Sequence, residues 1–328
     1  MHTAERFLRR ITSAAAVACV VACAVTVQAQ TYPTKPVKIV VGFSPGGPSD
    51  IISRLVGAKM GEILGQQFII ENKTGAGGTI AIDTAGRSDP DGYTILNTPL
   101  ANAVNETLTK TVRYKVGDGM MAVAPLAETA NVLVVHPSLG VKNVAELIAL
   151  AKSKPGEVLY ASAGRGSATH LTSEMFNMMA GVKLTPVHYK GGGDALKDLL
   201  SGQVKVMFSS IAPVLEFVRN GQLIGLATTK PARDPALPDL PTVSGAGLAG
   251  FDMRLWQGFT APTGIPRPVI EKLASATAQA LNSPDVKDSL TKQGFVPLTG
   301  TPEQFDAFYR SEVAKWRKVV EASGMTAE

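Results

Sequence analysis

Short apolar runs alternate with amphipathic segments along most of the chain. Residues 37–43 form the first buried run, and residues 50–64 then carry apolar side chains at helical spacing. Runs of strand length followed by helical segments return along the chain, which is typical of α/β folds in which helices cover parallel strands. The predicted strands are residues 37–43, 67–71, 93–98, 132–135, 158–162, 185–189, 204–208, 223–227 and 254–261. The predicted helices are residues 50–64, 144–154, 195–200, one that ends near 180, one around 215, and two that start at 268 and 302.

Two of these helices carry capping signals at their first residues. Asn143 is predicted to cap the helix that follows it, with Glu146 three residues later. Thr301 stands before Pro302 and Gln304 in the same arrangement, and proline suits the first turn of a helix. We therefore expect both helices to begin at these positions.

The first 29 residues are predicted to be a cleaved export signal. Three arginines open the segment, an apolar stretch spans residues 11–27, and Val27-Gln28-Ala29 offers the pattern that signal peptidase cleaves. The mature chain is then expected to start near Gln30. A membrane anchor is one alternative, because the stretch is almost long enough to span a bilayer, but it is rich in alanine and no charge cluster follows it. Lipidation at Cys23 is another, although the apolar residues after it make a poor mature terminus.

The composition of the mature chain excludes several classes of protein. Both cysteines, Cys19 and Cys23, lie in the signal segment, which removes disulfides, thiolate catalysis and cysteine-bound metals. Without the three arginines and one glutamate of that segment, 29 basic and 26 acidic residues remain, a net charge of about +3. No basic run or basic-aromatic stripe is present, so nucleic acid is not an expected partner. No second apolar stretch is long enough to span a membrane.

The length of the chain predicts two lobes, because about 300 mature residues exceed the usual size of one hydrophobic core. Between residues 228 and 248 the texture of the sequence changes. Prolines at positions 231, 235, 238 and 241 exclude a regular element there. We expect this segment to be irregular and to pass over the surface or between the lobes.

Three junctions between a predicted strand and the next helix are rich in glycine. They read Ser44-Pro45-Gly46-Gly47-Pro48-Ser49-Asp50, Gly164-Arg165-Gly166-Ser167 and Lys190-Gly191-Gly192-Gly193. In open α/β sheets, ligands bind beyond the carboxyl ends of the strands. Glycine lets the backbone approach a ligand there, and the N–H groups at a helix start favour an anion. A single loop of this kind is most simply a turn, but three of them, with serines at 44, 49, 162 and 167, predict an anion site.

The enzyme motifs in the sequence are incomplete. The segment Tyr160-Ala161-Ser162-Ala163-Gly164 has a tyrosine where a nucleophile elbow needs its first glycine. The Gly164-Arg165-Gly166 segment is not followed, about 20 residues later, by the acidic residue of a dinucleotide-binding fingerprint. The chain lacks a recognisable pair of base and nucleophile. We therefore predict no enzymatic activity and no cofactor.

The three mature histidines, His136, His170 and His188, lack metal-ligand spacing. His136 precedes a proline at a strand end, and both it and His188 are interpreted as structural. His170 falls in the first helical turn after Ser167, so it either faces a bound anion or packs against the loop. Asp50 is likewise either a helix cap or a ligand contact, and Trp256 is interpreted as a packing residue.

Taken in order, several motifs resemble those of one known family. They are Val40-Val41-Gly42-Phe43-Ser44-Pro45-Gly46-Gly47 with Asp50 and Arg54, Asn72-Lys73-Thr74-Gly75-Ala76-Gly77-Gly78, Asp89-Pro90-Asp91-Gly92-Tyr93-Thr94, Tyr160-Ala161-Ser162 with His170-Leu171, Tyr189-Lys190-Gly191, Leu237-Pro238-Asp239-Leu240-Pro241-Thr242 and Ala261-Pro262. This ordered set resembles the Bug family, the periplasmic substrate-binding proteins of tripartite tricarboxylate transporters. Each motif is weak alone, but the set runs from about Tyr32 to the C-terminus.

The resemblance implies a two-lobed periplasmic binding protein of the Venus-flytrap type, type II-like, with a ligand cleft between two doubly wound sheets. Lobe 1 is then expected to comprise residues 31–126 plus 250–328, and lobe 2 residues 127–249. The loops at 43–50 and 162–170 are expected to hold a ligand carboxylate from opposite lobes, through backbone amides, hydroxyls and ordered water, with residues 189–192 nearby. The residues implied for ligand binding are Phe43, Ser44, Gly46, Gly47, Ser49, Asp50, Ser162, Gly164, Arg165, Gly166, Ser167, His170, Tyr189, Gly191, Gly192 and Ser209.

Two positions depart from the family pattern. Gly192-Gly193-Asp194 stands where the family more often has an alanine-proline type of sequence, and Ser209 stands where aspartate is usual. The loss of a carboxylate at Ser209 makes the pocket less hostile to a second ligand carboxylate, or roomier. The ligand therefore stays open between a C4–C6 dicarboxylate, citrate and an aromatic mono- or dicarboxylate.

The resemblance also implies the partners of the chain. A monomeric receptor of this kind passes its ligand to a membrane permease of one large and one small subunit. One alternative is a sensing role, in which the liganded receptor binds the ectodomain of a histidine kinase. A secreted hydrolase is a distant alternative.

Overall fold

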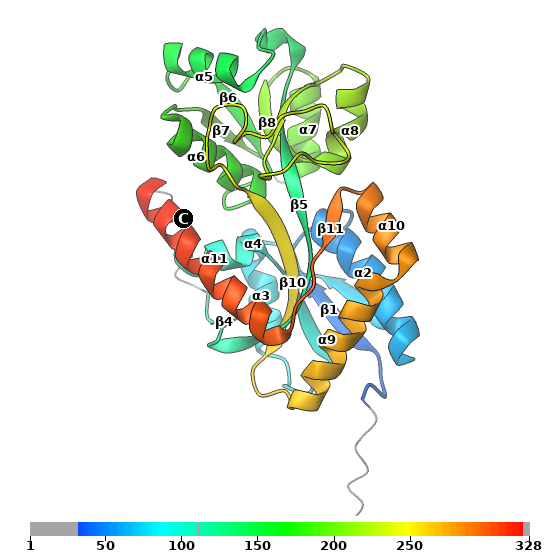
Figure 1. Ribbon diagram of the computed structural model, residues 1–328. Coiled ribbons are helices and arrows are strands. Elements are labelled where there is room, and N and C mark those ends of the chain that lie inside the picture. Colours follow the sequence, from blue (N-terminus) through cyan, green and yellow to red (C-terminus); the bar gives the residue numbers. More distant parts are fainter. Residues whose placement is uncertain (1–31, 110–111, 190, 324–328) are drawn as a thin grey trace, which may run out of the picture. The chain divides into compact units, whose positions relative to one another are not determined.

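Three strands from the start of the chain and one later strand form one half of a mixed sheet (Figure 1), and we call them the first strand group. The structure is a computed structural model that describes residues 32–109, 112–189 and 191–323. The predicted signal segment and Lys190 therefore lie outside the described residues. By its contacts, the chain from Lys35 onward forms one compact unit. The first strand group consists of β1 (Val37–Val41), β2 (Phe68–Asn72), β3 (Thr94–Pro99) and β10 (Arg254–Pro262).

A second strand group continues the same sheet, in the order β2-β1-β3-β10-β5-β8-β6-β7. It consists of β6 (Leu159–Ser162), β7 (Thr185–His188), β8 (Val206–Ser210) and β9 (Ile224–Thr228). The 17-residue strand β5 (Gly119–Val135) belongs to both groups, because its first part pairs with β10 and its last five residues pair with β8 and β9. Two short strands, β4 (Lys115–Val116) and β11 (Phe295–Pro297), also pair with β5.

The predicted parallel pairing holds for three strands of each group and fails where the groups join. Strands β2, β1 and β3 are parallel, as are β7, β6 and β8, whereas β10 runs antiparallel to β3 and β5, and β5 runs antiparallel to β8 and β9. The prediction overlooked most of β5, because Pro125, Glu128 and several alanines interrupt its apolar pattern. Nearly every residue of this strand is buried, and this burial, rather than local propensity, keeps the strand continuous.

Helices cover the strands of each group. The first group carries α2 (Pro48–Leu64), α3 (Thr79–Gly86), α4 (Leu100–Leu108), α9 (Arg267–Asn282), α10 (Pro284–Lys292) and α11 (Pro302–Ser323). The second group carries α5 (Val144–Ser153), α6 (Ala168–Ala180), α7 (Gly192–Leu200) and α8 (Ile211–Arg219). Short 3-10 turns lie at η1 (Ala76–Gly78) and η2 (Pro137–Leu139). The sequence did not predict α3, α4 or a separate α10.

The local signals read from the sequence are confirmed. Asn143 Oδ1 accepts a hydrogen bond from the Glu146 N–H at 2.9 Å. Thr301 Oγ1 accepts from the Gln304 N–H at 3.2 Å, and Gln304 Oε1 accepts from the Thr301 N–H at 2.9 Å, which completes a capping box. The proline-rich segment 228–248 contains no helix, and no strand follows the end of β9 at Thr228 within it.

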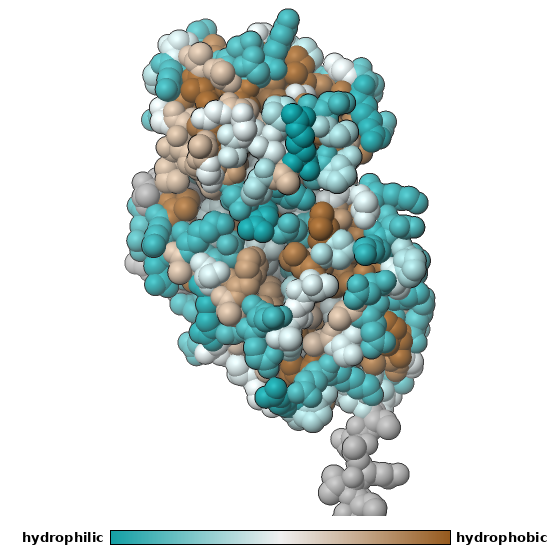
Figure 2. All heavy atoms as spheres, viewed as in Figure 1, coloured by the Kyte–Doolittle hydropathy of each residue, from teal (hydrophilic) through white to brown (hydrophobic). Residues whose placement is uncertain are grey.

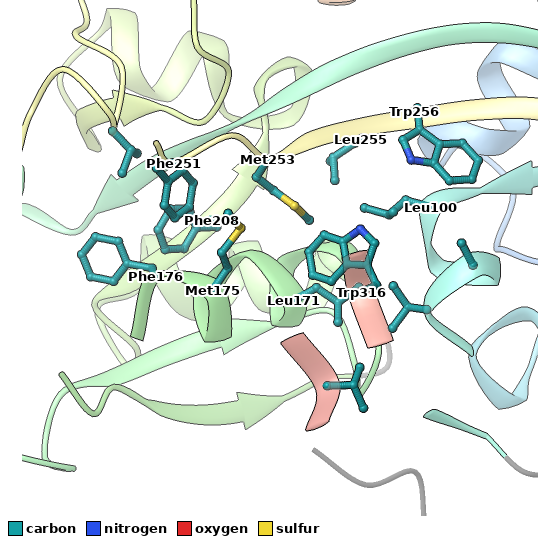
Figure 3. Close-up of a cluster of buried hydrophobic side chains, with 14 of the residues drawn as sticks. Leu100, Leu171, Met175, Phe176, Phe208, Phe251, Met253, Leu255, Trp256 and Trp316 are labelled. Atoms are coloured by element: carbon teal, nitrogen blue, oxygen red, sulfur yellow. The ribbon is translucent and has the colours of Figure 1, made fainter. Parts of the chain in front are cut away.

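The core of the sheet is continuous across the two strand groups (Figure 3). Leu100 of α4, Leu171 of α6 and Trp316 of α11 lie in one cluster with side chains of β8 and β10. Trp256 packs as expected: it is 1% exposed and donates to Glu312 Oε2 at 2.9 Å. Burial of each large side chain contributes roughly 1.5–3 kcal/mol, so this cluster anchors the framework beneath the loops.

The surface carries hydrophobic residues in small separate groups among hydrophilic ones on the face shown in Figure 2. The large apolar side chains that are exposed include Ile63, Ile69, Ile80, Leu159, Met178 and Val296. Across the described ranges, no helix combines the length and the apolar character needed to cross a membrane.

Candidate functional site

The loop between β1 and α2 is held by one buried carboxylate. Asp50, in the first turn of α2, accepts hydrogen bonds from the Gly46 N–H at 2.9 Å and from Asn72 Nδ2 at 3.0 Å. It also accepts two bonds of 2.9 Å from Arg54, through Nε and Nη2. Asn72 Nδ2 lies 3.0 Å from the Phe43 carbonyl as well, so the end of β2 is tied to both ends of the loop.

The Asp50 carboxylate shapes the loop through these bonds. Burial alone raises its pKa, but hydrogen bonds from Arg54, Gly46 and Asn72 outweigh that effect, so the pKa of Asp50 lies below its usual value. The group is therefore ionised at neutral pH. What the loop leaves to a ligand is the first turn of α2, where the N–H groups of Ser49 and Asp50 have no acceptor within the helix.

The other predicted residues of this loop differ in exposure. Ser44 and Gly46 are exposed, Phe43 and Gly47 are half-buried, and Ser49 is buried. Gly46 has a φ of 77°, in the left-handed region that favours glycine. The N–H groups of Gly46 and Gly47 donate within the loop, the latter to the Ser44 carbonyl at 3.2 Å. These glycines set the course of the backbone, and their amides are already bonded.

The loop between β6 and α6 carries a network of its own hydroxyl groups. Ser162 Oγ donates to the Gly164 carbonyl at 3.0 Å and lies 3.2 Å from the Gly164 N–H, which donates to it. Thr169 Oγ1 accepts from the Ala163 N–H at 2.8 Å and lies 2.9 Å from Ser167 Oγ. The serines that the sequence offered as ligand donors thus organise the loop in this structure.

His170 lies in the first turn of α6, as predicted, and its ring turns back onto the same loop. Its Nδ1 accepts a hydrogen bond from the Gly166 N–H at 3.1 Å. The ring is buried, with 9% of the residue exposed. Gly164 and Gly166 have φ values of 124° and 69°, which a residue with a Cβ atom rarely adopts. The hydrogen bond fixes the neutral ring with its proton on Nε2.

His188 lies against His170 at the carboxyl end of β7. The two rings meet edge to face, with centroids 4.8 Å apart and an interplanar angle of 87°. Burial, then His188 and then the charge of Arg165 lower the pKa of His170 to about 4. Burial and Arg165 also lower the pKa of His188. At neutral pH this side of the site therefore presents the exposed Arg165 guanidinium beside two neutral imidazoles.

The third predicted junction follows β7. Tyr189 donates from its hydroxyl to Asp198 Oδ2 at 2.8 Å, and burial followed by Asp198 raises the pKa of Tyr189 to about 12. Its backbone carbonyl lies 3.4 Å from where a Cβ atom on Gly164 would stand, so the loop after β6 and the loop after β7 touch. Gly191 caps α7 with an extended backbone, and the exposed Gly192 begins that helix.

Ser209 lies on β8, where it pairs with Val132 of β5. The residue is buried, at 3% exposed, and its hydroxyl donates to the Ser210 carbonyl at 3.0 Å. Among the residues that the structure describes, its hydroxyl makes no hydrogen bond to the glycine-rich loops. Its role toward a ligand stays a prediction.

Helix α4 brings the loops of the two strand groups together. Asn105 Nδ2 donates to the Gly77 carbonyl at 2.8 Å, in the loop after β2. A Cβ atom placed on Gly166 would lie 3.6 Å from Asn105 Oδ1 and 3.3 Å from Leu108 Cδ2. The Phe43 ring lies within 3.4 Å of the corresponding position on neighbouring Gly78. Contacts thus run from the loop between β1 and α2 (the first loop), through the loop after β2 and helix α4, to the loop between β6 and α6 (the second loop).

Four asparagines of this region were not predicted as site residues, although Asn72 opens one of the motifs shared with the family. Asn72 and Asn105 tie loops together, whereas Asn97 and Asn102 are buried and carry polar atoms without a hydrogen-bond partner in the described part of the chain. Buried amides are normally paired, so these groups are available to a ligand or to water. The signal that could have found Asn97 and Asn102 is their position, since Asn97 lies within the predicted strand at 93–98 and Asn102 lies four residues beyond its end.

Two hollows lie outside these loops. A shallow one of about 550 Å³ is lined by Pro36, Gly57, Ala58, Gly61, Gly65, Gln66, Gln67 and Phe68. It has no charged side chain to bind an anion. A small cavity of about 10 Å³, which has room for about one water molecule, lies between Asn102, Glu106 and Tyr309. Within residues 32–323 apart from the three positions left undescribed, no cluster of His, Cys, Asp and Glu could hold a metal ion.

Comparison with known proteins decides the family. Residues 52–325 match the model of the tripartite tricarboxylate transporter family receptor. The chain belongs to this receptor family. BugT of Bordetella pertussis is 35% identical over 305 residues, which cover 92% of this chain and 93% of BugT.

Two solved proteins from Rhodopseudomonas palustris have the same fold. One, solved with adipate, has a TM-score of 0.84 and 33% identity, covering 90% of this chain and 99% of the other. MatC, with bound malate, has a TM-score of 0.81 and 32% identity, covering 88% and 100%. The resemblance read from the sequence, the periplasmic-binding-protein fold and the prediction that the chain is no enzyme are thereby confirmed. Membership of this receptor family implies a periplasmic location.

Proposed function

We propose that this receptor captures a small dicarboxylate in the periplasm and delivers it to a tripartite tricarboxylate-type transporter. The single observation that carries the proposal is that contacts through the loop after β2 and Asn105 join the first loop (Phe43 to Asp50) to the second loop (Ser162 to His170). These loops lie at the carboxyl ends of parallel strands from different strand groups, where ligands of open α/β sheets bind. The first turn of α2 supplies N–H donors, and Arg165 supplies a positive charge.

The ligand class is supported by the two Rhodopseudomonas palustris relatives, which were solved with adipate and with malate. Each of these ligands carries two carboxylates. In our proposal one carboxylate lies at the loop Phe43 to Asp50 and the other at the loop Ser162 to His170, with Tyr189, Gly191, Gly192 and Ser209 around them. Buried Asn97 and Asn102 lend further polar groups, directly or through water.

The proposal extends to how the receptor works. Residues 31–126 with 250–328 act as one lobe and residues 127–249 as the other, and closure of the lobes over the ligand produces the form that the permease recognises. Residues 1–29 direct export and are cleaved. The permease is a membrane protein of one large and one small subunit.

Thermal-shift screening of the purified mature protein against a panel of carboxylates tests the binding function. Adipate, malate, citrate and an aromatic acid represent the classes that the sequence left open. A ligand at 100 times its dissociation constant raises the free energy of unfolding by ~2.7 kcal/mol, a clear shift of the melting temperature. No shift with any carboxylate of the panel would contradict the proposal.

Delivery to a transporter needs a separate test. Deletion of the gene should abolish uptake of the acid that the screen selects, and complementation should restore uptake. If uptake persists while transcription no longer responds to the acid, the receptor serves a sensor and the transport part of the proposal is wrong.

A further inference from the structure

His188 occupies a position at the site that its sequence context did not reveal. It is the last residue of β7, in register with Ser162 at the end of the neighbouring strand β6. Its ring lies edge to face with that of His170. The positive charge of the Arg165 guanidinium lowers the pKa of both histidines. The second loop therefore gathers three nitrogen-bearing side chains, at the place where the proposed function puts a ligand carboxylate.

The backbone of this loop has few N–H groups left for an anion. The amides of Ala163, Gly164 and Gly166 donate to Thr169 Oγ1, Ser162 Oγ and His170 Nδ1, at distances between 2.8 and 3.2 Å. The Ser167 amide donates to the Gly164 carbonyl at 3.2 Å. An anion that binds here must therefore be stabilised mainly by side chains.

His170 is not the side chain that gains charge. Its Nδ1 accepts from the Gly166 N–H, and protonation of that atom would replace the hydrogen bond by two opposed N–H groups. Its burial also disfavours the charged ring. His170 is thus a positioning residue, which holds the loop and supports the ring of His188.

His188 is free of these constraints. The residue is exposed, and neither of its ring nitrogens has a hydrogen-bond partner among the residues that the structure describes. Among the described residues, the groups that face it are Arg165 from the loop and His170 from α6, while Tyr189 beside it on the chain donates to Asp198 of α7. Burial and Arg165 lower the pKa of His188, and no carboxylate is among the causes. A carboxylate supplied by a ligand would therefore be the first to act on it.

We propose that His188 takes up a proton when an anionic ligand binds beside Arg165, so that the receptor binds its ligand more tightly as the pH falls. The inference rests on the proposed function, because it needs a carboxylate at this loop. The ligand carboxylate offsets the repulsion from Arg165 and pairs with the imidazolium that forms. Neutral His188 becomes a charged donor without a change in the fold.

The sign of the effect follows from linkage. An opposite charge within about 4–6 Å moves a pKa by about 1–3 units toward the charged form, so the complex binds more protons than the free receptor. The dissociation constant then falls with pH, by at most about tenfold per pH unit for one proton. We expect the affinity for a dicarboxylate to rise about three- to tenfold between pH 7.5 and 5.5.

Isothermal titration calorimetry in two buffers of different ionisation enthalpy counts the protons directly. Adipate and malate serve as probes near pH 6.5, the ordinary pKa of histidine, where both carboxyl groups of each acid are largely ionised. Wild-type protein should take up a measurable fraction of a proton on binding. His188→Gln should bind without proton uptake, and its affinity should no longer rise between pH 7.5 and 5.5.

His136→Gln is the matched control, since His136 lies away from the loop and bonds to Ser138 Oγ at 2.8 Å. It should keep the uptake of wild type. Binding without proton uptake in wild type, or uptake that persists in His188→Gln, would overturn the inference and leave the proposed function standing. Failure of adipate, malate and the whole carboxylate panel to bind would instead overturn the proposed function, and this inference with it. Circular dichroism of His188→Gln, and His188→Asn as a second variant, checks that the fold is unchanged.

Discussion

Gly166 and Asn105 lie against each other across the junction of the two strand groups. A Cβ atom on Gly166 would stand 3.6 Å from Asn105 Oδ1, and the φ of Gly166 is 69°. Asn105 in turn donates to the Gly77 carbonyl. This contact links the loop of one group to helix α4 of the other, and the left-handed φ of Gly166 favours a residue without a side chain.

Gly166→Ala should therefore weaken ligand binding at least tenfold while the protein remains folded. Because Gly166 has a left-handed backbone conformation, its replacement by alanine should also lower the free energy of unfolding by about 1–2 kcal/mol. Gly181→Ala is the matched control: Gly181 ends the same helix with a φ of 60°, and nothing lies within 4 Å of its Cβ position. It should show the same loss of stability in urea and bind the ligand normally in calorimetry. Equal affinities of both variants would remove the second loop from the site.

Asp50→Asn should loosen the first loop. The change removes the charge that holds Arg54 and the Gly46 N–H, and a lost bond at a buried charged group costs about 1–3 kcal/mol. Asp83→Asn on α3 breaks a similar i,i+4 pair with Arg87, but Asp83 is exposed to 37%, so about 0.5 kcal/mol or less is expected. Urea unfolding and calorimetry on both variants measure stability and affinity. Equal effects of the two variants would show that Asp50 forms an ordinary surface pair.

His170 makes the stability of the free protein depend on pH. Its pKa is about 4 in the folded state and about 6.5 in the unfolded state. Below pH 6.5 the unfolded state therefore binds more protons, so the free energy of unfolding falls as the pH falls toward 4, by about 2 kcal/mol at pH 5. The burial-raised pKa of Glu106 acts with the opposite sign, but it is common to wild type and variant. Urea unfolding at pH 7.5, 6 and 5 should show a smaller pH dependence for His170→Gln, and curves that stay parallel would contradict this.

Tyr309 and Glu106 join α11 to α4 beneath the site. The Tyr309 hydroxyl donates to Glu106 Oε1 at 2.8 Å, and the Val116 N–H donates to the same oxygen at 3.3 Å. Tyr309→Phe should lower the free energy of unfolding by about 1–2 kcal/mol, because the buried carboxyl group loses a partner. Tyr189→Phe removes a bond of the same length, but Tyr189 is half-buried whereas Tyr309 is buried, so this change should cost less. Differential scanning calorimetry compares the two; a larger loss for Tyr189→Phe would contradict the ranking by burial.

Periodicity and capping predicted most strands and helices to within a few residues. Asn143 and Thr301 show why: their side chains bond to the backbone three residues later, so the signal is local. The long strand β5 was not predicted beyond its last residues, because its identity depends on pairing with β10 and β8, which are distant in sequence. The antiparallel join between the strand groups was hidden for the same reason.

The candidate site was only partly visible in the sequence. Glycine marked the loops, since a positive φ at Gly46 and Gly166 needs it. The sequence could not show that the hydroxyls of Ser162 and Thr169 accept hydrogen bonds within their own loop. Each bonds to a backbone group whose position depends on the folded loop. Asn105 was passed over within an unpredicted helix, and the position of His188 beside His170 arises from the pairing of β6 with β7.

The central claim, that the receptor recognises the charge of a small dicarboxylate, is tested most directly by one calorimetric comparison. Adipate and its dimethyl ester have the same chain, but only the acid carries the two negative charges that Arg165 and the first turn of α2 are proposed to hold. The account predicts binding of a dicarboxylate with a dissociation constant at least about a hundredfold below that of its diester, a difference of ~2.7 kcal/mol. The comparison is made with adipate, malate or whichever acid of the panel binds most tightly. Equal affinity for acid and diester, or binding of the diester alone, would contradict it.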